Sequence, residues 1–502
     1  MQATEVRSYK HFINGEWVDP LDGETIPRNN PATGALVAEF ASGNEEDSRR
    51  AIAAARRAFY EGPWPRMTGN ERGRLLYKFA QKMREEEEKL AIIDVEETGK
   101  TIRFARDDIN AAIALVEYAA GLASQVHGEV YSNLGENYNA TVVREPAGVA
   151  GLVIPWNFPA LIFCQKAPFA LAAGCTVVVK PSEFTSGSAL ELARMAKEAG
   201  IPDGVLNVVT GVGTATGQVL AESSDVDVLS FTGSTATGRR VMEAATSNLK
   251  KLSLELGGKA ANIVFADADL EDALDGVLFG IYFNQGECCV SGTRLLVEDS
   301  IADEFMEKLV ERAASLKVGD PMDEQTDIGA LINPDHMKKV LGFIEKGRNQ
   351  GATLRTGGER LTGSSYDNGA FVAPTIFDDV RPEMEIFQEE IFGPVLSVSR
   401  FGSKEEAIEE ANAVRYGLAN SVWTKNLDTA MLVSRALRSG TVWVNCTIEV
   451  YPQTPFGGYK ESGFGREMGR AGMEEFTEVK NVLYRLGKRE PFFGGDRGPM
   501  GV

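Results

Sequence analysis

Short, wholly apolar segments alternate with amphipathic ones along the middle of the chain. The apolar segments read GVAGLVIP, CTVVVKP, VLNVVTG, VDVLSFTGS and KLSLELGG, and stretches with helical spacing of apolar residues separate them. A strand that is apolar on both faces is typical of a parallel sheet with helices packed on either side. The pattern therefore predicts a doubly wound, Rossmann-like α/β domain in this part of the chain.

The flanking regions have different patterns. Amphipathic helices are predicted between Asn44 and about residue 127, and the glutamate run at 85–88 is interpreted as a solvated helix face. Residues 128–147 alternate like a β-hairpin that leaves the main body. A second α/β series covers about 259–460, and the tail offers one strand before a Gly/Pro-rich end.

Size and charge limit the classes of function. The chain has 502 residues, more than one ordinary core needs, which predicts at least two large domains. Its 52 Lys and Arg against 72 Asp and Glu give a formal charge of −20. Because so acidic a surface repels phosphates, neither nucleic acid nor an anionic membrane is expected as a partner.

The five cysteines, Cys164, Cys175, Cys288, Cys289 and Cys446, fit neither a zinc site nor a disulfide framework. The N-terminal residues hold no apolar core of signal-peptide length, and prolines interrupt the longest uncharged run, 147–164. We therefore expect a soluble protein of the reducing cytoplasm, with no membrane span and no metal.

Two of the apolar strands end in residues suited to a ligand at the carboxyl edge of a doubly wound sheet. Gly233 and Gly238 in FTGSTATG precede a helix whose N-terminus can receive a diphosphate, although a plain tight turn explains them equally well. After VVVK, Glu183 can accept ribose hydroxyls and would repel a 2′-phosphate. A helix capped by Ser182 is the alternative interpretation of that segment.

Asn157 and Glu255 follow or end apolar strands as candidate catalytic groups. Asn157 stands between two prolines in PWNFP and is either a rigid oxyanion donor or a turn residue. Glu255 in LSLELGGK has an apolar flank, which should raise its pKa toward that of a general base. A salt bridge to Lys259 is the alternative.

The segment FNQGECCVSGTR, residues 283–294, holds adjacent cysteines after a glycine-containing turn. Backbone amides of such a turn can stabilise a thiolate, although a buried structural thiol is the usual fate of a cysteine. Because neighbouring side chains point apart in most backbone conformations, we expect at most one of the two thiols to face a site.

Together these motifs resemble the aldehyde dehydrogenase superfamily, in its NAD(P)-dependent, hydrolytic form, over nearly the whole chain. The family's cysteine motif falls on GECCVS and implies Cys289 as nucleophile, with Cys288 as its spectator. ELGGK implies Glu255 as the base, and PWNFP implies Asn157 as the oxyanion amide. Glu287 stands where the family more often has Gln, and either assists proton movement or binds a backbone amide.

The resemblance also implies NAD as cofactor. KPSE implies Lys180 as the coenzyme lysine, which is also expected among the catalytic residues, and Glu183 as the ribose-binding residue. EIFGP places Glu390 at the nicotinamide ribose. The residues expected around the coenzyme are Ile154, Pro155, Trp156, Lys180, Ser182, Glu183, Gly213, Gly217, Phe231, Gly233, Ser234, Thr237, Leu256, Gly257, Glu390 and Phe392.

For the substrate, the resemblance implies a tunnel. Gln165 stands where semialdehyde-oxidising members often carry Arg, which argues against a short carboxylated substrate. Glu449 would attract an amino or quaternary ammonium aldehyde, but no aromatic cage is evident at the matched positions. We expect a medium-sized aliphatic or aromatic aldehyde, with betaine, amino or semialdehydes as alternatives. The expected lining is Ala111, Ile162, Gln165, Phe283, Cys288, Glu449 and Phe456.

Three parts are implied: an NAD-binding domain of 1–127 and 147–257, a catalytic domain of 258–470, and a bridging element of 128–146 with 471–502. In the family this element pairs strands across subunits, so a homodimer or homotetramer is expected.

The implied reaction begins with addition of the Cys289 thiolate to the aldehyde. The oxyanion would lie between the Asn157 amide and the Cys289 N–H, and after hydride transfer Glu255 would activate water to hydrolyse the thioester. Glu255 counts against a CoA-acylating member, and the complete set of groups counts against an inactive structural protein. None of His11, His127 and His336 suggests the Cys–His pair of a thiol hydrolase.

Overall fold

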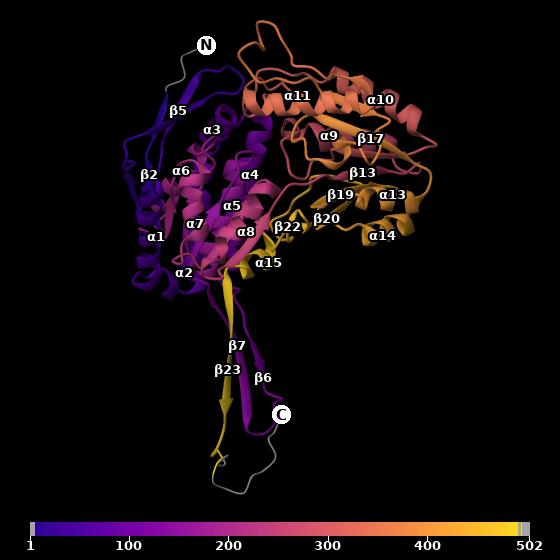
Figure 1. The fold of residues 1–502 in the computed structure, drawn as a ribbon. Helices are drawn as coiled ribbons and strands as arrows, with labels where there is room; N and C mark the ends of the chain where they lie inside the picture. The colour runs from indigo at the N-terminus through magenta and orange to yellow at the C-terminus, as the bar shows by residue number, and fades with distance from the viewer. Residues whose placement is uncertain (1–5, 490–492, 494–502) are drawn as a thin grey trace.

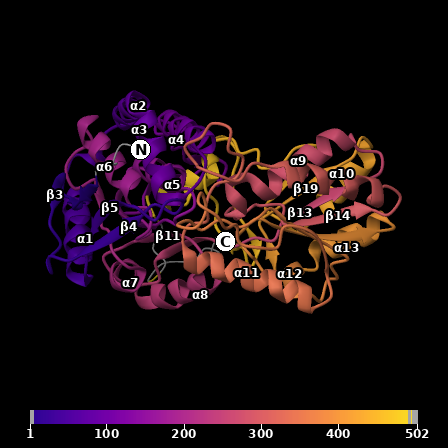
Figure 2. The ribbon, with the colours of Figure 1, turned by 90° about the horizontal axis from the view of Figure 1, so that it is seen from above.

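Two α/β bodies lie side by side and a narrow β-sheet projects from them (Figures 1 and 2). The computed structural model describes residues 6–489 and residue 493. Residues 1–5, 490–492 and 494–502, which belong to the first and last of the expected domain segments, lie outside the described residues.

The first body is built on an eight-stranded sheet in the order β22-β12-β11-β8-β9-β10-β2-β3. Its five central strands are parallel and almost wholly buried, which confirms the doubly wound prediction. These strands are β8 (Val149–Val153), β9 (Thr176–Lys180), β10 (Leu206–Val208), β11 (Val228–Thr232) and β12 (Lys251–Glu255), and antiparallel edges are added by β2 (His11–Ile13), β3 (Glu16–Val18) and β22 (Gly463–Phe464).

Helices follow four of the five central strands, β8 to β11, and cover the sheet. A second layer of helices from the N-terminal third packs on α5. A small sheet of β1 (Arg7–Tyr9), β5 (Leu36–Ala41) and β4 (Thr25–Asn29) completes this body. The helices are α1 (Glu45–Tyr60), α2 (Gly69–Glu85), α3 (Glu87–Thr98), α4 (Ile102–Leu122), α5 (Pro159–Ala173), α6 (Gly187–Glu198), α7 (Gln218–Glu222) and α8 (Thr235–Ala244).

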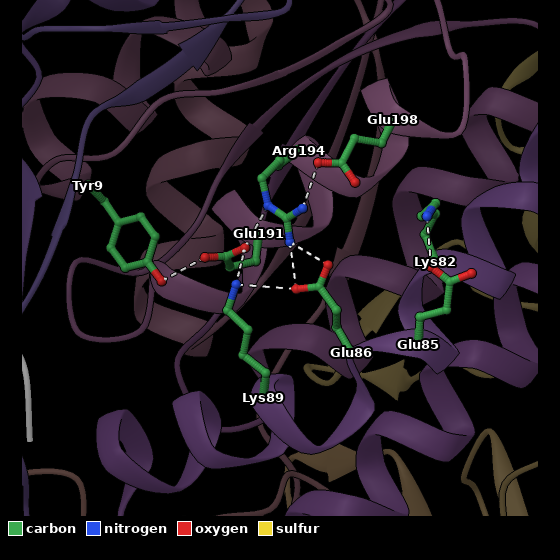
Figure 3. A network of polar contacts seen from close by, with 8 residues as sticks. All are labelled: Tyr9, Lys82, Glu85, Glu86, Lys89, Glu191, Arg194 and Glu198. Atoms are coloured by element: carbon green, nitrogen blue, oxygen red, sulfur yellow. Dashed lines mark hydrogen bonds and ion pairs between the residues drawn. The ribbon is translucent and has the colours of Figure 1, made fainter.

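Ion pairs hold α6 against the junction of α2 and α3 (Figure 3). Arg194 donates to both carboxylate oxygens of Glu86, at 2.7 and 2.9 Å, and to Glu191 at 2.8 Å. Glu191 also accepts from the Tyr9 hydroxyl at 3.1 Å. The glutamate run at 85–88 is therefore not only a solvated face, because Glu86 is in this network while the other three residues are exposed.

The second body has a seven-stranded sheet in the order β15-β16-β17-β14-β13-β19-β20. All pairs are parallel except β15 with β16. The strands are β13 (Ala261–Val264), β14 (Arg294–Glu298), β15 (Thr353–Thr356), β16 (Thr375–Asp378), β17 (Val395–Phe401), β19 (Ala419–Trp423) and β20 (Thr441–Val444), and the main helices are α9 (Leu270–Tyr282), α10 (Ala302–Ser315), α11 (Pro334–Asn349), α13 (Lys404–Asn412) and α14 (Leu427–Ala436).

The chain returns from the second body to the first through β22. Gly463 pairs with Glu255 and Phe464 with Leu254, so the last residues of β12 are fixed by a segment some two hundred residues further on. Ser462 adds two bonds, accepting from the Leu256 N–H at 3.0 Å and donating to the Gly257 carbonyl at 2.7 Å. The end of β12 is therefore held at the boundary between the two bodies.

The projecting sheet, called the stalk, contains the predicted hairpin as β6 (Glu129–Tyr131) and β7 (Tyr138–Pro146). The predicted C-terminal strand is β23 (Thr477–Arg485), and it pairs with β7 along its whole length (Figure 1). Among the described helices, none has both the length and the apolar character needed to cross a membrane.

Candidate active site

Cys289 lies where two cavities meet. The smaller, of about 210 Å³, opens at the carboxyl edge of the first sheet and is called the edge cavity. The larger, of about 500 Å³, is mostly apolar and is called the tunnel. Both cavities are lined by Ile162, Thr232, Leu256 and Cys289. The Cys289 thiol is therefore accessible from two sides by two different molecules.

A strained turn over residues 283–289, called the catalytic turn, presents the two cysteines. After α9, Asn284 and Gln285 have φ of 50° and 47°, and Gly286 has φ of 75°. A run of left-handed residues is rare and persists only where its surroundings fix it. The Asn284 side chain supplies one such restraint, donating to the carbonyls of Asn157 at 3.2 Å and Glu287 at 3.0 Å.

The expectation that at most one cysteine faces the site is wrong. Both Cys288 and Cys289 line the tunnel, and their thiols form a hydrogen bond. Only Cys289 also reaches the edge cavity. The expectation assumed an extended backbone, whereas the Ser291 N–H donates to the Cys288 carbonyl at 3.1 Å and closes a turn through both cysteines.

The pKa of the Cys289 thiol is raised well above its usual value. The hydrogen bond with Cys288 is the largest cause, followed by burial and by the nearby carboxyls of Glu255 and Glu390. The surrounding residues therefore favour the protonated thiol of Cys289. A nearby proton acceptor is needed to make the sulfur nucleophilic.

Asn157 lies in the loop between β8 and α5 and lines the edge cavity beside Cys289. Its side chain is 3% exposed, and its Nδ2 donates to the Glu287 carbonyl at 2.9 Å. One N–H of the amide is thus occupied by the catalytic turn, which fixes the amide and leaves its second N–H for another acceptor.

Glu255 lines the tunnel with Cys289, and its side chain is 3% exposed. Neither carboxylate oxygen has a hydrogen-bond partner among the described residues. Burial, and then the charge of Glu467, raises the pKa of Glu255 well above its usual value. The alternative of a salt bridge with Lys259 is not observed, because the Lys259 ammonium also lacks a hydrogen-bond partner among the described residues and the carboxylates whose charge acts on its pKa are Glu390 and Glu389.

Half of the residues expected around a coenzyme line the edge cavity. Among them, burial raises the pKa of Glu390 to about 7, and its Oε1 accepts from the Gly258 N–H at 2.9 Å. A Cβ at Gly257 would lie 2.3 Å from the Glu390 carboxylate, so any other residue there would displace that carboxylate. Those lining the cavity are Pro155, Trp156, Gly233, Ser234, Leu256, Gly257, Glu390 and Phe392.

The other half lie beyond that cavity, at or near the carboxyl ends of β8, β9 and β11 and in the helical segments that follow β10 and β11. Lys180 Nζ lies 3.5 Å from Glu183 Oε2, and the Ser182 hydroxyl accepts from the Phe184 N–H at 3.3 Å. Helix α6 begins only at Gly187, so the alternative of Ser182 as its cap is wrong. Those outside the cavity are Ile154, Lys180, Ser182, Glu183, Gly213, Gly217, Phe231 and Thr237.

The tunnel brings together every residue expected at the substrate. Its described lining includes no Lys or Arg, and it carries two exposed carboxylates, Asp107 and Glu449, that form no ion pair with a described residue. The expected residues on its wall are Ala111, Ile162, Gln165, Phe283, Cys288, Glu449 and Phe456.

The sequence profile of the aldehyde dehydrogenase family matches residues 17–482. The chain belongs to the aldehyde dehydrogenase family. It is 45% identical over 488 residues to aldehyde dehydrogenase family 2 member C4 of Arabidopsis thaliana, which covers 97% of both chains. Betaine aldehyde dehydrogenase of Bacillus subtilis is 45% identical over 94% of this chain and 96% of its own.

A solved structure gives the same result for the fold. The NAD-dependent aldehyde dehydrogenase from Sinorhizobium meliloti superposes with a TM-score of 0.95 at 47% identity, over 97% of this chain and 96% of that one. The α/β architecture inferred from the apolar pattern is therefore that of an aldehyde dehydrogenase.

Two features of this aldehyde dehydrogenase site were missed in the sequence. His336, at the start of α11, lines the edge cavity with Cys289. Its ring packs edge-on against Trp156, with 5.6 Å between the ring centroids. Burial lowers the pKa of His336 to about 4, and its Nε2 lies 2.6 Å from the Phe392 carbonyl, so it is not a base paired with the cysteine. From the sequence, His336 was considered only as a partner of a catalytic cysteine. No motif around His336 indicates that it lines a cavity.

The second missed feature is an aromatic cluster in the tunnel. Phe283 lies 4.8 Å from Phe104, 5.1 Å from Phe279 and 5.8 Å from Phe158 between ring centroids. The four rings come from α4, α9, the turn after α9 and the loop before α5, so no local spacing could indicate them. An aromatic wall is thus present, although none was evident at the positions matched in the sequence.

Proposed function

We propose that this protein oxidises an aldehyde to the carboxylic acid with NAD as cofactor. Cys289, Asn157 and Glu255 meet at the junction of two cavities, where one molecule can approach the thiol from each side, and this arrangement is the main support for the proposal. An acylating reaction with CoA is less well supported, because transfer of the acyl group to a thiol does not need the base that Glu255 offers to a water molecule.

The edge cavity, together with the residues beyond it at the ends of β9 and β11, suits NAD. It reaches the Cys289 thiol, it holds the Glu390 carboxyl in its wall, and Gly233 and Ser234 at the start of α8 supply amide donors suited to a diphosphate. Glu183 beyond the cavity would accept ribose hydroxyls and disfavour a 2′-phosphate, which supports NAD over NADP. When bound, NAD supplies the acceptor for the hydride that leaves the aldehyde carbon.

The first half of the reaction belongs to Cys289 and Asn157. Because the pKa of the thiol is raised, its proton must leave as the sulfur adds to the aldehyde carbon, and the Glu255 carboxylate across the tunnel is the acceptor. Addition gives a thiohemiacetal on Cys289. The free N–H of the fixed Asn157 amide and the Cys289 N–H stabilise its oxyanion, each worth about 3 kcal/mol in other enzymes.

The second half belongs to Glu255. The acyl group left on Cys289 after oxidation is a thioester, and its hydrolysis needs a base that deprotonates water. Glu255 can be that base once it has released the Cys289 proton to solvent. A carboxyl with no hydrogen-bond partner and a raised pKa is a suitable base, because it binds a proton strongly. Attack of that water releases the carboxylic acid and restores the thiol.

The tunnel supports a medium-sized aromatic or aliphatic aldehyde as substrate. Its wall is largely apolar, and the four phenylalanines provide faces on which a flat or branched hydrocarbon can pack. The absence of Lys and Arg among the described lining residues disfavours a carboxylated aldehyde. A cation-bearing aldehyde is the second candidate, because Asp107 and Glu449 lie unpaired on the tunnel wall and aromatic faces attract cations.

A panel of aldehydes assayed for reduced NAD tests both candidates. We expect kcat/KM for an anionic semialdehyde to be at least about tenfold below that of a neutral aromatic aldehyde of similar size, because two carboxylates line its path. In the double variant Asp107→Asn, Glu449→Gln, cationic aldehydes should lose about three- to tenfold in kcat/KM and neutral ones should not.

The outcome for neutral aldehydes is the internal control. If the double variant slows neutral and cationic aldehydes equally, the carboxylates do not select charge. If no aldehyde in the panel reduces NAD or NADP, the proposed function is wrong.

We further propose the division into an NAD-binding domain, a catalytic domain and a bridging element, with the stalk joining copies of the chain. The stalk is narrow and both of its edge strands, β6 and β23, leave backbone groups unpaired. Val130, Val479, Leu483 and Tyr484 are each more than half exposed on it. All five cysteines are free, which supports a reducing, cytoplasmic location.

Light scattering at several concentrations tests the oligomer. We expect a mass two or four times the 54.4 kDa of the chain. When Val479 and Leu483 are both replaced by Glu, the dissociation constant of the oligomer should rise by at least about tenfold. Leu21→Glu, at a side chain 51% exposed and far from the stalk in sequence, is the control. A wild-type mass of one chain would contradict the proposal.

A further inference from the structure

Glu287 is a fully buried carboxyl that joins three segments around the active site. Its Oε1 accepts from the Ile332 N–H at 2.9 Å, and its Oε2 accepts from Gln285 Nε2 at 3.2 Å. Its backbone carbonyl is the acceptor for the Asn157 amide at 2.9 Å. The residue thus links the loop before α11, the catalytic turn and the candidate oxyanion donor.

The catalytic turn needs such a link. Its left-handed residues, Asn284, Gln285 and Gly286, directly precede Glu287. The Asn284 amide restrains the beginning of this run, and the Glu287 side chain restrains its end. Gly286 is pressed against the Gly393 carbonyl, where a Cβ would approach to 2.3 Å. Removing the Glu287 carboxyl would release one end of a conformation that its surroundings must enforce.

The other end of the link is equally fixed. The Ile332 carbonyl accepts from Arg28 Nη2 at 2.9 Å, and the buried Arg28 guanidinium also binds the Glu97 carbonyl through Nε at 3.0 Å. A hydrogen-bonded path therefore runs from β4, through Ile332 and Glu287, to Asn157. Every member of this path is nine-tenths or more buried, so water does not compete for its bonds.

The charge on Glu287 depends on its neighbours from several elements. Burial raises the pKa of Glu287 to about 8, against the opposing effects of the Ile332 amide, of Gln285 and of Lys100 and Arg28. His336 Nε2 lies 3.7 Å away on α11, but its lowered pKa leaves it neutral. At neutral pH Glu287 therefore holds a proton, and it becomes an anion as the pH rises through about 8.

A protonated Glu287 has the hydrogen-bonding capacity of a glutamine. Gln285 Oε1 is buried without a partner, and rotating the Gln285 amide would present this oxygen to a donor on Glu287. The anion loses that donor. It also places a negative charge on the residue whose carbonyl orients Asn157, where it opposes a developing oxyanion.

We propose that Glu287 is a positioning residue for the reaction proposed above, whose side chain orients Asn157 through the catalytic turn and whose proton is needed for full activity. The inference rests on that proposed function, because Asn157 is taken as the oxyanion donor. The proposal predicts that charge and position can be separated by two substitutions.

The test compares kcat and both KM values of wild type, Glu287→Gln and Glu287→Ala between pH 6 and 10. Glu287→Gln keeps both hydrogen bonds and should retain kcat within about twofold at pH 7. It should lack the fall in kcat that wild type shows as pH rises through about 8. Glu287→Ala should lose about 10- to 100-fold in kcat, with smaller changes in KM, because a small displacement of a catalytic group has effects of that size.

Asp94→Asn is the matched control. Asp94 is also fully buried, with its pKa raised by burial to about 7, but it has no hydrogen bond to the catalytic turn. It should keep the wild-type pH profile. A Glu287→Gln profile that coincides with wild type, or a Glu287→Ala enzyme with wild-type kcat, overturns the proposal. Where Glu287→Ala does not fold, the Glu287→Gln profile alone decides.

A second readout separates this proposal from the proposed function. In a Cys288→Ala background, the rate at which iodoacetamide alkylates Cys289 requires neither aldehyde nor NAD. Glu287→Ala should change that rate at least about threefold, and Glu287→Gln should leave it within that margin at pH 7. If no aldehyde is oxidised and the alkylation rates still differ in this way, only the proposed function has failed. Equal rates overturn the positioning role.

Discussion

Replacing Cys289 by alanine is expected to lower NAD reduction by more than about 10³-fold for every aldehyde that the wild-type enzyme oxidises. The reaction proposed above forms its covalent intermediate on this sulfur, and no other group at the junction of the two cavities can replace it. Cys288 lines only the tunnel and does not reach the edge cavity. Initial rates of absorbance by reduced NAD, with protein folding checked by circular dichroism, measure the effect.

Cys288→Ala is the matched control, and it is expected to make the Cys289 thiol more reactive. The hydrogen bond with Cys288 is the largest cause of the raised pKa of Cys289, so its removal should lower that pKa and speed alkylation. Turnover should stay within about tenfold of wild type. Loss of turnover in Cys288→Ala, with Cys289→Ala active, would reverse the assignment of the nucleophile.

The strands that carry this chemistry could be predicted because they are apolar on both faces. The runs ending at Lys180, Thr232 and Glu255 are central strands of a parallel sheet, and a pattern with no polar face has few other solutions. Candidate residues placed at the ends of such strands come together for a geometric reason, since parallel strands end at one edge. Glu255 and Lys180 lie there as their positions imply.

The features that could not be predicted depend on contacts between distant segments. The left-handed backbone at Asn284 and Gln285, before the two cysteines, gave no local signal, because neither residue has a glycine's freedom. The four phenylalanines of the tunnel come from separate elements. The raised pKa of Cys289 arises from Cys288 and from carboxyls brought by other segments. Such features exist only once the chain is packed.

Glu287 lies between these two cases. Its departure from the commoner glutamine was visible in the sequence, and both a proton-moving and an amide-binding role were considered. The structure shows the bond to the Ile332 amide, but the path onward to Arg28 joins residues more than three hundred positions apart. A local anomaly can thus be found from sequence, whereas its consequence requires the tertiary contacts.

Replacing Glu255 by glutamine is expected to slow the first half of the cycle, where the Cys289 proton must then leave to water, and to stop the cycle at the thioester. The amide has the shape of the carboxyl but cannot take a proton from water, so the thioester on Cys289 should persist. We expect a burst of reduced NAD of up to one equivalent per Cys289, followed by steady turnover about 10²- to 10⁴-fold slower than wild type. Rapid mixing with a saturating aldehyde measures the burst and the steady rate separately.

Stability and rescue distinguish lost chemistry from lost structure. A buried carboxyl whose pKa is raised on folding opposes folding more strongly as pH rises above its unfolded pKa, so Glu255→Gln should not lower the unfolding temperature at neutral pH. Hydroxylamine, a nucleophile that needs no deprotonation, should restore steady turnover of this variant by attacking the thioester. If the burst is absent and hydroxylamine has no effect, Glu255 acts before the thioester, as the acceptor of the Cys289 proton alone.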